Sequence, residues 1–268
     1  MAIDYSELKI GQKVEEFNRT IKEIISKDKD HIVYIDEHGT ICTSNDLSFV
    51  VTTEFGKIQN RISYWESVCN RVFSKKEALD LKCLLAEGYA RMYESNDFNA
   101  ANEIINDATK RIEVQGKQIL RQDYLIASLY CTLVIITLLI FSILFKDFIL
   151  RYLSKNVFHI YVTALFGGIG AFVSTMIRAR KYKAEISSSR RIHMIDGSLR
   201  VFYGLIASLL IALGIKANLL LGFINATESN VYVLFFMGAI GGASEWFLPN
   251  IIKQFEKNEN PKLVDQPK

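Results

Sequence analysis

Residues 124–145, YLIASLYCTLVIITLLIFSILF, form a run of 22 positions without a charged side chain. A helix needs about 20 predominantly apolar residues to cross the hydrocarbon core of a bilayer. Three further stretches are also long and predominantly apolar, namely residues 156–177, residues 201–224 with Lys216 inside them, and residues 230–252 with Glu245 inside them. The sequence therefore predicts an integral membrane protein with four transmembrane helices.

The connecting segments predict how these helices are oriented. Residues 178–200, between the second and third stretches, carry seven Lys or Arg residues against two acidic ones, a net charge of +5. Positively charged loops stay in the cytoplasm. We therefore expect a multi-pass protein with both termini in the cytoplasm. The expected domains are a cytoplasmic domain at 1–122, a four-span transmembrane domain at 123–252 and a cytoplasmic tail at 253–268.

The N-terminal region is predicted to be an α+β domain, although the fold class as a whole is mainly α. Apolar residues at helical spacing predict a helix over residues 5–28. Residues 31–43, HIVYIDEHGTICT, place a turn between two β-rich runs and predict a hairpin, which residues 48–54 are expected to extend. This small sheet is predicted to precede the helical part of the domain.

Helical periodicity returns from Lys57 onward and predicts a helical hairpin that breaks at Asn96 and Asp97. An apolar stripe from Ala101 to Ile119 then continues toward the first membrane stretch. We expect one long helix there, bent at Gly116, and we hypothesise that it transmits movement of the cytoplasmic domain to the first span.

The membrane half contains an internal repeat. Residues 129–174 align without gaps on residues 200–245, with ten identical positions, and IYVTALFGGIGA (160–171) matches VYVLFFMGAIGG (231–242). This pattern predicts two helical hairpins of the same orientation, related by an axis along the membrane normal.

The glycine-rich motifs within this repeat have two interpretations. Small residues let helices approach closely in lipid, and they also suit helices that line a pathway. Polar residues inside spans are costly and usually functional. Glu245 is therefore predicted either to form a cation-selecting ring or to pair with Arg178 or Arg200. The predicted pore-lining or packing residues are Gly167, Gly168, Gly170, Ser174, Gly238, Gly241, Gly242, Ser244 and Glu245.

A second candidate site lies in the cytoplasmic region. Residues 57–121 carry 11 basic and 9 acidic residues with aromatic side chains between them. Cations of this kind bind phosphates and aromatic rings stack on bases, although solvated helix faces explain the same pattern. The ligand-binding candidates are Arg61, Tyr64, Trp65, Arg71, Lys75, Lys76 and Lys82.

The chemical motifs of common enzymes are missing from the sequence. It contains no P-loop, HExxH or GxSxG motif and no paired metal-ligand spacing. We therefore expect no enzyme activity, no catalytic residues, no metal and no cofactor. The four cysteines, without a CxxC pair, are expected to be reduced thiols.

Three motifs carry a resemblance to a known family: GGIGAFVS (167–174), IDGSLRVFYG (195–204) and GAIGGASEWFLP (238–249). With them, residues 123–256 resemble the four-helix channel module of bacterial anti-phage defence effectors, and the Hailong-type membrane effector is the nearest type. The resemblance implies an inner-membrane location, a homo-oligomeric channel, and short DNA or a nucleotide from a partner nucleotidyltransferase as the regulating ligand.

The combined expectation is an oligomeric ion channel in the bacterial inner membrane, gated through its cytoplasmic domain and acting in anti-phage defence. One alternative is a membrane-anchored scaffold or sensor that recruits a cytoplasmic partner. Another is a small transporter, which would show saturable, substrate-specific flux.

Overall fold

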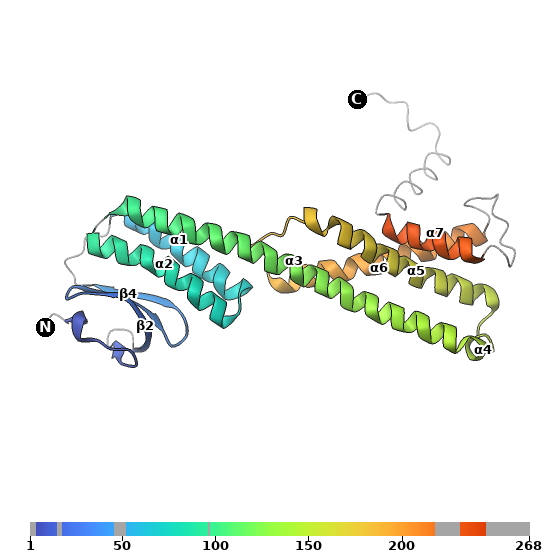
Figure 1. Cartoon of the computed structure of the whole chain (residues 1–268), viewed down its shortest axis with the longest axis horizontal. Helices are drawn as coiled ribbons and strands as arrows, with labels where there is room; N and C mark the ends of the chain where they lie inside the picture. Colours follow the sequence, from blue (N-terminus) through green and yellow to red (C-terminus); the bar gives the residue numbers. More distant parts are fainter. Residues whose placement is uncertain (1–3, 15–17, 46–51, 96, 218–230, 245–268) are drawn as a thin grey trace, which may run out of the picture. The chain divides into compact units, whose positions relative to one another are not determined.

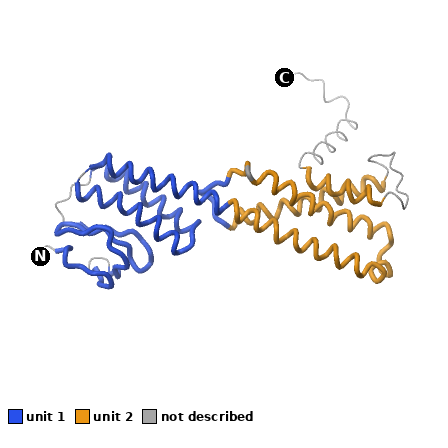
Figure 2. Tube along the Cα trace, in the orientation of Figure 1, with its two compact units in different colours: residues 1–120, 184–190 blue, residues 121–183, 191–268 orange. Residues whose placement is uncertain are grey.

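The computed structural model describes residues 4–14, 18–45, 52–95, 97–217 and 231–244, and the side chain of Arg180 is outside this description. The chain is mainly helical and carries a small sheet near its N-terminus. It divides into two compact units (Figure 2). We call residues 1–120 with 184–190 the N-terminal unit, and residues 121–183 with 191–268 the C-terminal unit. The segment 184–190 therefore belongs to the N-terminal unit, although it lies between two helices of the other.

The order of elements in Figure 1 runs from strands to helices. The bounds are η1 Tyr5–Glu7, β1 Lys13–Val14, β2 Arg19–Lys27, β3 His31–Asp36, β4 Ile41–Asn45, α1 Thr53–Val72, α2 Lys75–Ser95, α3 Phe98–Leu144, α4 Lys146–Ile149, α5 Lys155–Arg178, η2 Ala179–Lys181, α6 Arg190–Lys216 and α7 Val231–Ala243.

The sheet is an antiparallel meander in the order β1-β2-β3-β4. All six residues of β3 are buried, so this strand needs a partner along each edge. It pairs with β2, where Ile24 lies opposite Tyr34, and with β4, where Tyr34 lies opposite Cys42. Helix α2 packs against β2, β3 and β4, so the sheet lies along one side of the α1–α2 pair (Figure 1). The predicted hairpin is confirmed.

The helix predicted over residues 5–28 is wrong. This segment forms η1, β1 and β2 instead. Gly11 and Asn18 both adopt positive φ angles, of 87° and 52°, and a helix cannot continue through such residues. The apolar residues at helical spacing are partly β-branched, and two register shifts in β2 change which of them face the core.

Residues 48–54 were predicted to extend the sheet, but the described part of this segment, residues 52–54, does not form a strand. Residues 46–51 lie outside the described residues, and Thr53 and Glu54 already belong to α1. Thr52 caps that helix by accepting a hydrogen bond from the Phe55 backbone N–H, at 3.2 Å. Threonine is a favoured N-cap residue, and this explains why a β-rich run ends in a helix.

The helical hairpin is confirmed, and its break falls where it was predicted. The Asp97 carboxylate accepts hydrogen bonds from the N–H groups of Asn99 and Ala100 at the start of α3. Helix α3 then continues for 47 residues and contributes to both units. The prediction of one long helix is confirmed, because α3 is helical through Gly116. Gly116 is a packing position, described below.

Three helices are long and apolar enough to cross a membrane, namely α3, α5 and α6. The first three predicted spans fall within them, although residues 218–224 of the third lie outside the described residues. Helix α7, in the fourth predicted span, is described over 13 residues, and residues 245–252 lie outside the description. The structure thus gives three candidate spans and one shorter apolar helix.

Packing in the C-terminal unit joins the two halves of the predicted repeat. Helices α5 and α7, which carry the glycine motifs, are in extensive contact. One apolar cluster combines Ile211 and Ile215 of α6 with Leu234 of α7, and another combines Ile135, Leu165 and Val201 of α3, α5 and α6. Outward-facing residues such as Tyr232 and Leu144 remain highly exposed, which suits a lipid environment.

Candidate functional site

The predicted glycines lie where α5, α6 and α7 come into backbone contact. A Cβ atom on Gly170 would overlap the carbonyl oxygen of Ala239, and one on Gly242 would overlap the carbonyl oxygen of Gly167. No larger side chain fits such crossings without moving a helix. Within the described residues, these glycines therefore pack the helices of one chain together. The same holds for Gly168, Gly238 and Gly241, each of which meets a side chain of a neighbouring helix.

A polar hydroxyl is buried inside the same crossing. Ser208 of α6 is fully buried, and its hydroxyl donates to the carbonyl oxygen of Gly238. The glycine at position 238 exposes its backbone carbonyl to a neighbouring helix, and the serine satisfies it. Sequence reasoning did not select Ser208, because a lone serine in an apolar stretch carries no distinguishing pattern.

A cavity of about 530 Å³ opens among α5, α6 and α7. Two predicted residues, Ser174 and Ser244, contribute to its lining, together with Gly241 and Gly242. It also contains two charged residues that were not predicted as lining, Asp196 and Arg200 of α6. They are four residues apart, so they share one helix face. The cavity is therefore a mainly apolar recess that also holds two charged side chains. Glu245 lies outside the described residues and follows directly after Ser244 in the chain.

Arg200 is held in place by buried aromatic residues. Its Nη1 donates to the Tyr124 hydroxyl at 2.8 Å, and Tyr124 is almost fully buried. The Tyr124 ring stacks on Tyr182 with 4.3 Å between centroids, and the Tyr182 hydroxyl hydrogen bonds to His193 Nδ1 at 2.8 Å. Burial, with a smaller contribution from the Asp196 charge, raises the pKa of Tyr182. This chain of contacts preorganises the cation of the cavity.

In the N-terminal unit, the structure separates the ligand-binding candidates into four groups. Arg61 donates to Asn106 Oδ1 at 2.6 Å, which ties α1 to α3. Tyr64 is half exposed and its ring contacts Trp65 edge-on, with 5.4 Å between the two centroids. The exposed residues Arg71, Lys75 and Lys76 follow one another across the turn from α1 to α2. The fourth group is Lys82 alone, which is buried.

Lys82 belongs to a structural network around the hairpin turn. Its ammonium group donates to the carbonyl oxygen of Gly39 and lies 3.7 Å from Glu66. The Glu66 carboxylate also accepts from the Ile41 backbone N–H at 2.9 Å, and burial raises its pKa. This buried pair therefore fastens the turn between β3 and β4 to α1 and α2, and it directs Lys82 into the fold.

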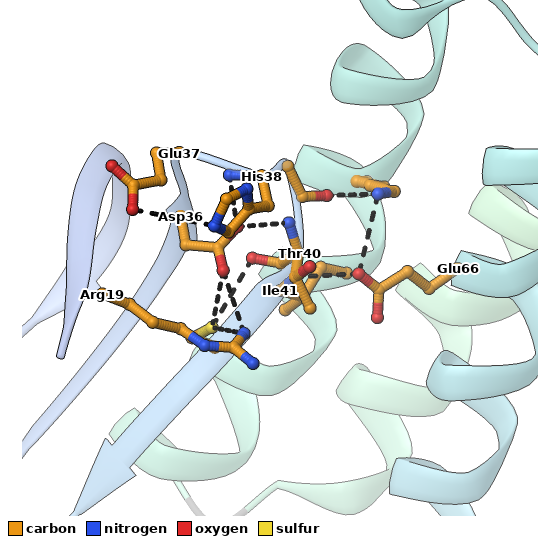
Figure 3. Close-up of polar contacts among 10 residues, drawn as sticks. Arg19, Asp36, Glu37, His38, Thr40, Ile41 and Glu66 are labelled. Atoms are coloured by element: carbon orange, nitrogen blue, oxygen red, sulfur yellow. Dashed lines mark hydrogen bonds and ion pairs between the residues drawn. The ribbon is translucent and has the colours of Figure 1, made fainter. Parts of the chain in front are cut away.

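The turn itself is organised by Asp36, which is fully buried. Its carboxylate accepts from the N–H groups of His38 and Thr40, at 3.0 and 2.7 Å, and from Arg19 Nη1 at 2.9 Å (Figure 3). Such an arrangement is typical of aspartate in a turn. His38 and Glu37 remain exposed at its tip. We find no group of three or more potential metal ligands among the described residues.

Comparison of the chain with known proteins gives no match to a protein family, to a curated protein or to a solved structure.

Proposed function

We propose that this protein is an oligomeric ion channel of the bacterial inner membrane, gated through its N-terminal unit. In this proposal the N-terminal unit is cytoplasmic, and the channel acts as an effector in anti-phage defence. The observation that carries the proposal is the cavity that holds the charged residues Asp196 and Arg200 among helices otherwise suited to lipid. Charged groups in such helices are costly and commonly mark an ion pathway.

The position of the charges supports an ion-conducting mouth. Asp196 and Arg200 carry opposite charges in one recess, and Ser174 and Ser244 add hydroxyl groups that can replace water around an ion. Tyr124 fixes the Arg200 side chain, so the positive charge has a defined place. The apolar outer surfaces of α3 and α6 provide faces for lipid and for neighbouring subunits.

The proposed ligand is a nucleotide or a short oligonucleotide supplied by a partner nucleotidyltransferase. The exposed cations Arg71, Lys75 and Lys76 offer the best phosphate contacts among the candidates, because they are close in the chain and accessible. Tyr64 is the exposed aromatic side chain for base stacking. Lys82 contributes to the fold rather than to this surface.

The decisive experiment is ion flux through the purified full-length protein in liposomes, with and without short single-stranded DNA or cyclic oligonucleotides. Arg200→Gln removes the cation of the cavity and should raise the cation-to-anion permeability ratio. Asp196→Asn should lower it. Arg191→Gln, an exposed arginine of the same helix outside the cavity lining, is the matched control and should leave the ratio unchanged.

Two further arms complete this test. Glu245→Ala addresses the acidic residue that follows the cavity in the chain, and it should lower cation selectivity if Glu245 belongs to the pathway. Equal permeability ratios for the Arg200, Asp196 and Arg191 variants would contradict a pathway through the cavity. Absence of flux from a well-folded oligomer, with every ligand tried, would contradict the channel itself.

One observation favours a second candidate, a membrane-anchored scaffold. The predicted glycines bring α5, α6 and α7 of one chain together and leave no open space at their own crossings. A scaffold needs only such a compact anchor, with the N-terminal unit as its recruiting part. It would show no flux, and Glu245→Ala would leave its function unchanged.

A further inference from the structure

We propose that residues 184–190 are a coupling segment through which the N-terminal unit controls the helices α5 and α6. The proposal rests on the proposed gating function and names its mechanical element. The segment packs with the N-terminal unit, yet it is covalently joined to the C-terminal unit at Lys183 and at Arg191. Any shift of the segment is therefore imposed on the ends of two candidate spans.

An apolar contact anchors the middle of the segment. The Ile186 side chain lies against Gly116 of α3, and a Cβ atom at position 116 would come within 2.7 Å of Ile186 Cδ1. The Phe73 ring is beside the same point, at 3.6 Å from that Cβ position. The missing side chain of Gly116 thus leaves the space that Ile186 fills. This contact explains why a glycine interrupts the buried stripe of α3.

A hydrogen bond holds the segment just after Ile186, and a charge of α2 faces its C-terminal end. Arg71 Nη1 donates to the carbonyl oxygen of Ser187 at 3.0 Å. Glu77 of α2 has its pKa lowered, chiefly by hydrogen bonds from Ser74 and in smaller part by the charge of Arg190. Three helices of the N-terminal unit, α1, α2 and α3, therefore contact or face one short segment.

Arg71 connects this segment to the candidate ligand surface. The same guanidinium that binds the Ser187 carbonyl lies beside Lys75 and Lys76 in the chain, and all three side chains are exposed. A guanidinium binds an anionic phosphate more strongly than a neutral carbonyl oxygen. Ligand binding at this corner would thus withdraw Arg71 from Ser187 and release the segment. The ligand would thus favour the state in which Arg71 has left Ser187 over the state in which the two are hydrogen bonded.

The test compares two alanine substitutions of helical glycines in the full-length protein in lipid nanodiscs. Gly116→Ala places a methyl group against Ile186, whereas Gly56→Ala, in α1, meets nothing within 4 Å. Both changes raise helix propensity equally. Hydrogen exchange is followed at the Ser188 amide, which donates to the Glu185 carbonyl at 3.1 Å, and at the adjoining turns of α5 and α6.

We expect Gly116→Ala to speed hydrogen exchange about tenfold in residues 184–190 and to change the exchange rate in the adjoining turns of α5 and α6. Gly56→Ala should leave exchange unchanged in all of these residues. Adding Ile186→Val to Gly116→Ala removes the clashing Cδ1 and should restore wild-type exchange. Arg71→Ala should also loosen the segment, whereas Arg91→Ala, an exposed arginine of α2, should not.

The outcomes separate this inference from the channel proposal. If Gly116→Ala and Gly56→Ala exchange at the same rate in residues 184–190, the contact between Gly116 and Ile186 does not anchor the segment. Faster exchange in residues 184–190 with unchanged turns of α5 and α6 overturns the coupling. Flux measured in parallel addresses the channel alone: if no variant conducts while exchange behaves as expected, the segment still couples the units and the channel proposal fails.

Discussion

Arg200 Nη1 donates a hydrogen bond to the Tyr124 hydroxyl, and this 2.8 Å contact joins α6 to α3 beside the cavity. Tyr124 is 2% exposed and its ring stacks on Tyr182, so the hydroxyl is a fixed acceptor. The two residues are 76 positions apart in the chain. Their contact gives the positive charge of Arg200 a defined place on α6, which the sequence alone did not predict.

We predict that Tyr124→Phe lowers the stability of the C-terminal unit by about 1 kcal/mol, the usual net worth of a hydrogen bond. The ring and its stacking on Tyr182 are retained, so the change isolates the hydroxyl. Thermal unfolding in detergent measures the effect. Tyr130→Phe, on the same helix and 66% exposed, is the control and should stay within about 0.5 kcal/mol of wild type. Equal shifts for both variants would count against the contact.

The glycine contacts predict an order of severity. Gly170→Ala forces a methyl group against the Ala239 backbone, so α5 and α7 must separate, at a cost of about 2 kcal/mol. Gly168→Ala meets the ends of two flexible side chains, Ile135 at 2.6 Å and Leu205 at 3.1 Å. These side chains can rotate, and alanine gains about 1 kcal/mol of helix propensity, so a change near zero is expected. Detergent melting curves that rank the two variants in reverse order would refute this interpretation.

A third prediction concerns the buried pair of Lys82 and Glu66, which are 3% and 14% exposed. Glu66→Gln keeps an acceptor for the Ile41 N–H but leaves the Lys82 charge buried without an opposite charge. We expect a loss of about 3 kcal/mol in the stability of the N-terminal unit, by chemical denaturation. The same substitution at Glu113, in an exposed pair with Lys117, should cost less than about 0.5 kcal/mol.

A double variant separates the charge from the packing. Glu66→Gln combined with Lys82→Met removes both charges and keeps most of the volume, so much of the lost stability should return. If the double variant is as unstable as Glu66→Gln alone, the effect lies in the hydrogen bonds of the turn rather than in an unpaired charge.

Patterns that depend on local chemistry were predictable from the sequence. Long apolar runs, the turn around Gly39 and the helix break at Asp97 are each set by a few neighbouring residues. The prediction of a helix over residues 5–28 was wrong, because part of this segment, β2, becomes a strand by pairing with the buried strand β3. That pairing cannot be seen in the segment itself. The apolar spacing there fits a helix as well as a strand with two register shifts.

Contacts between residues distant in the chain account for what the sequence did not predict. Lysine is a residue type that commonly binds phosphate, and only the contacts of Lys82 with Gly39 and Glu66 show that its side chain faces inward. Gly116 suggested a bend, whereas Ile186, 70 positions later, explains why a glycine is needed. Asp196 and Arg200 read as loop charges until α6 was found to begin at Arg190 and to bring them into the cavity wall.

The last prediction follows from the fully buried thiol of Cys69 on α1, whose pKa burial raises from its ordinary value of 9.0 to about 12. A group whose pKa is higher in the folded state binds its proton more tightly there. The resulting stability is fully present below pH 9 and is lost as the pH rises toward 12.

The free energy of unfolding of the wild type should therefore fall more steeply between pH 8 and 10.5 than that of Cys69→Ala. At pH 10.5 the loss of free energy of unfolding since pH 8 should be about 2 kcal/mol larger in the wild type than in Cys69→Ala, since each pKa unit corresponds to about 1.4 kcal/mol. Denaturation is followed by Trp65 fluorescence in a Trp246→Phe background, which makes Trp65 the only tryptophan of the chain. Ionisation of the buried tyrosines occurs in both proteins and cancels in the difference. Parallel curves would mean that the thiol reaches solvent before the N-terminal unit unfolds.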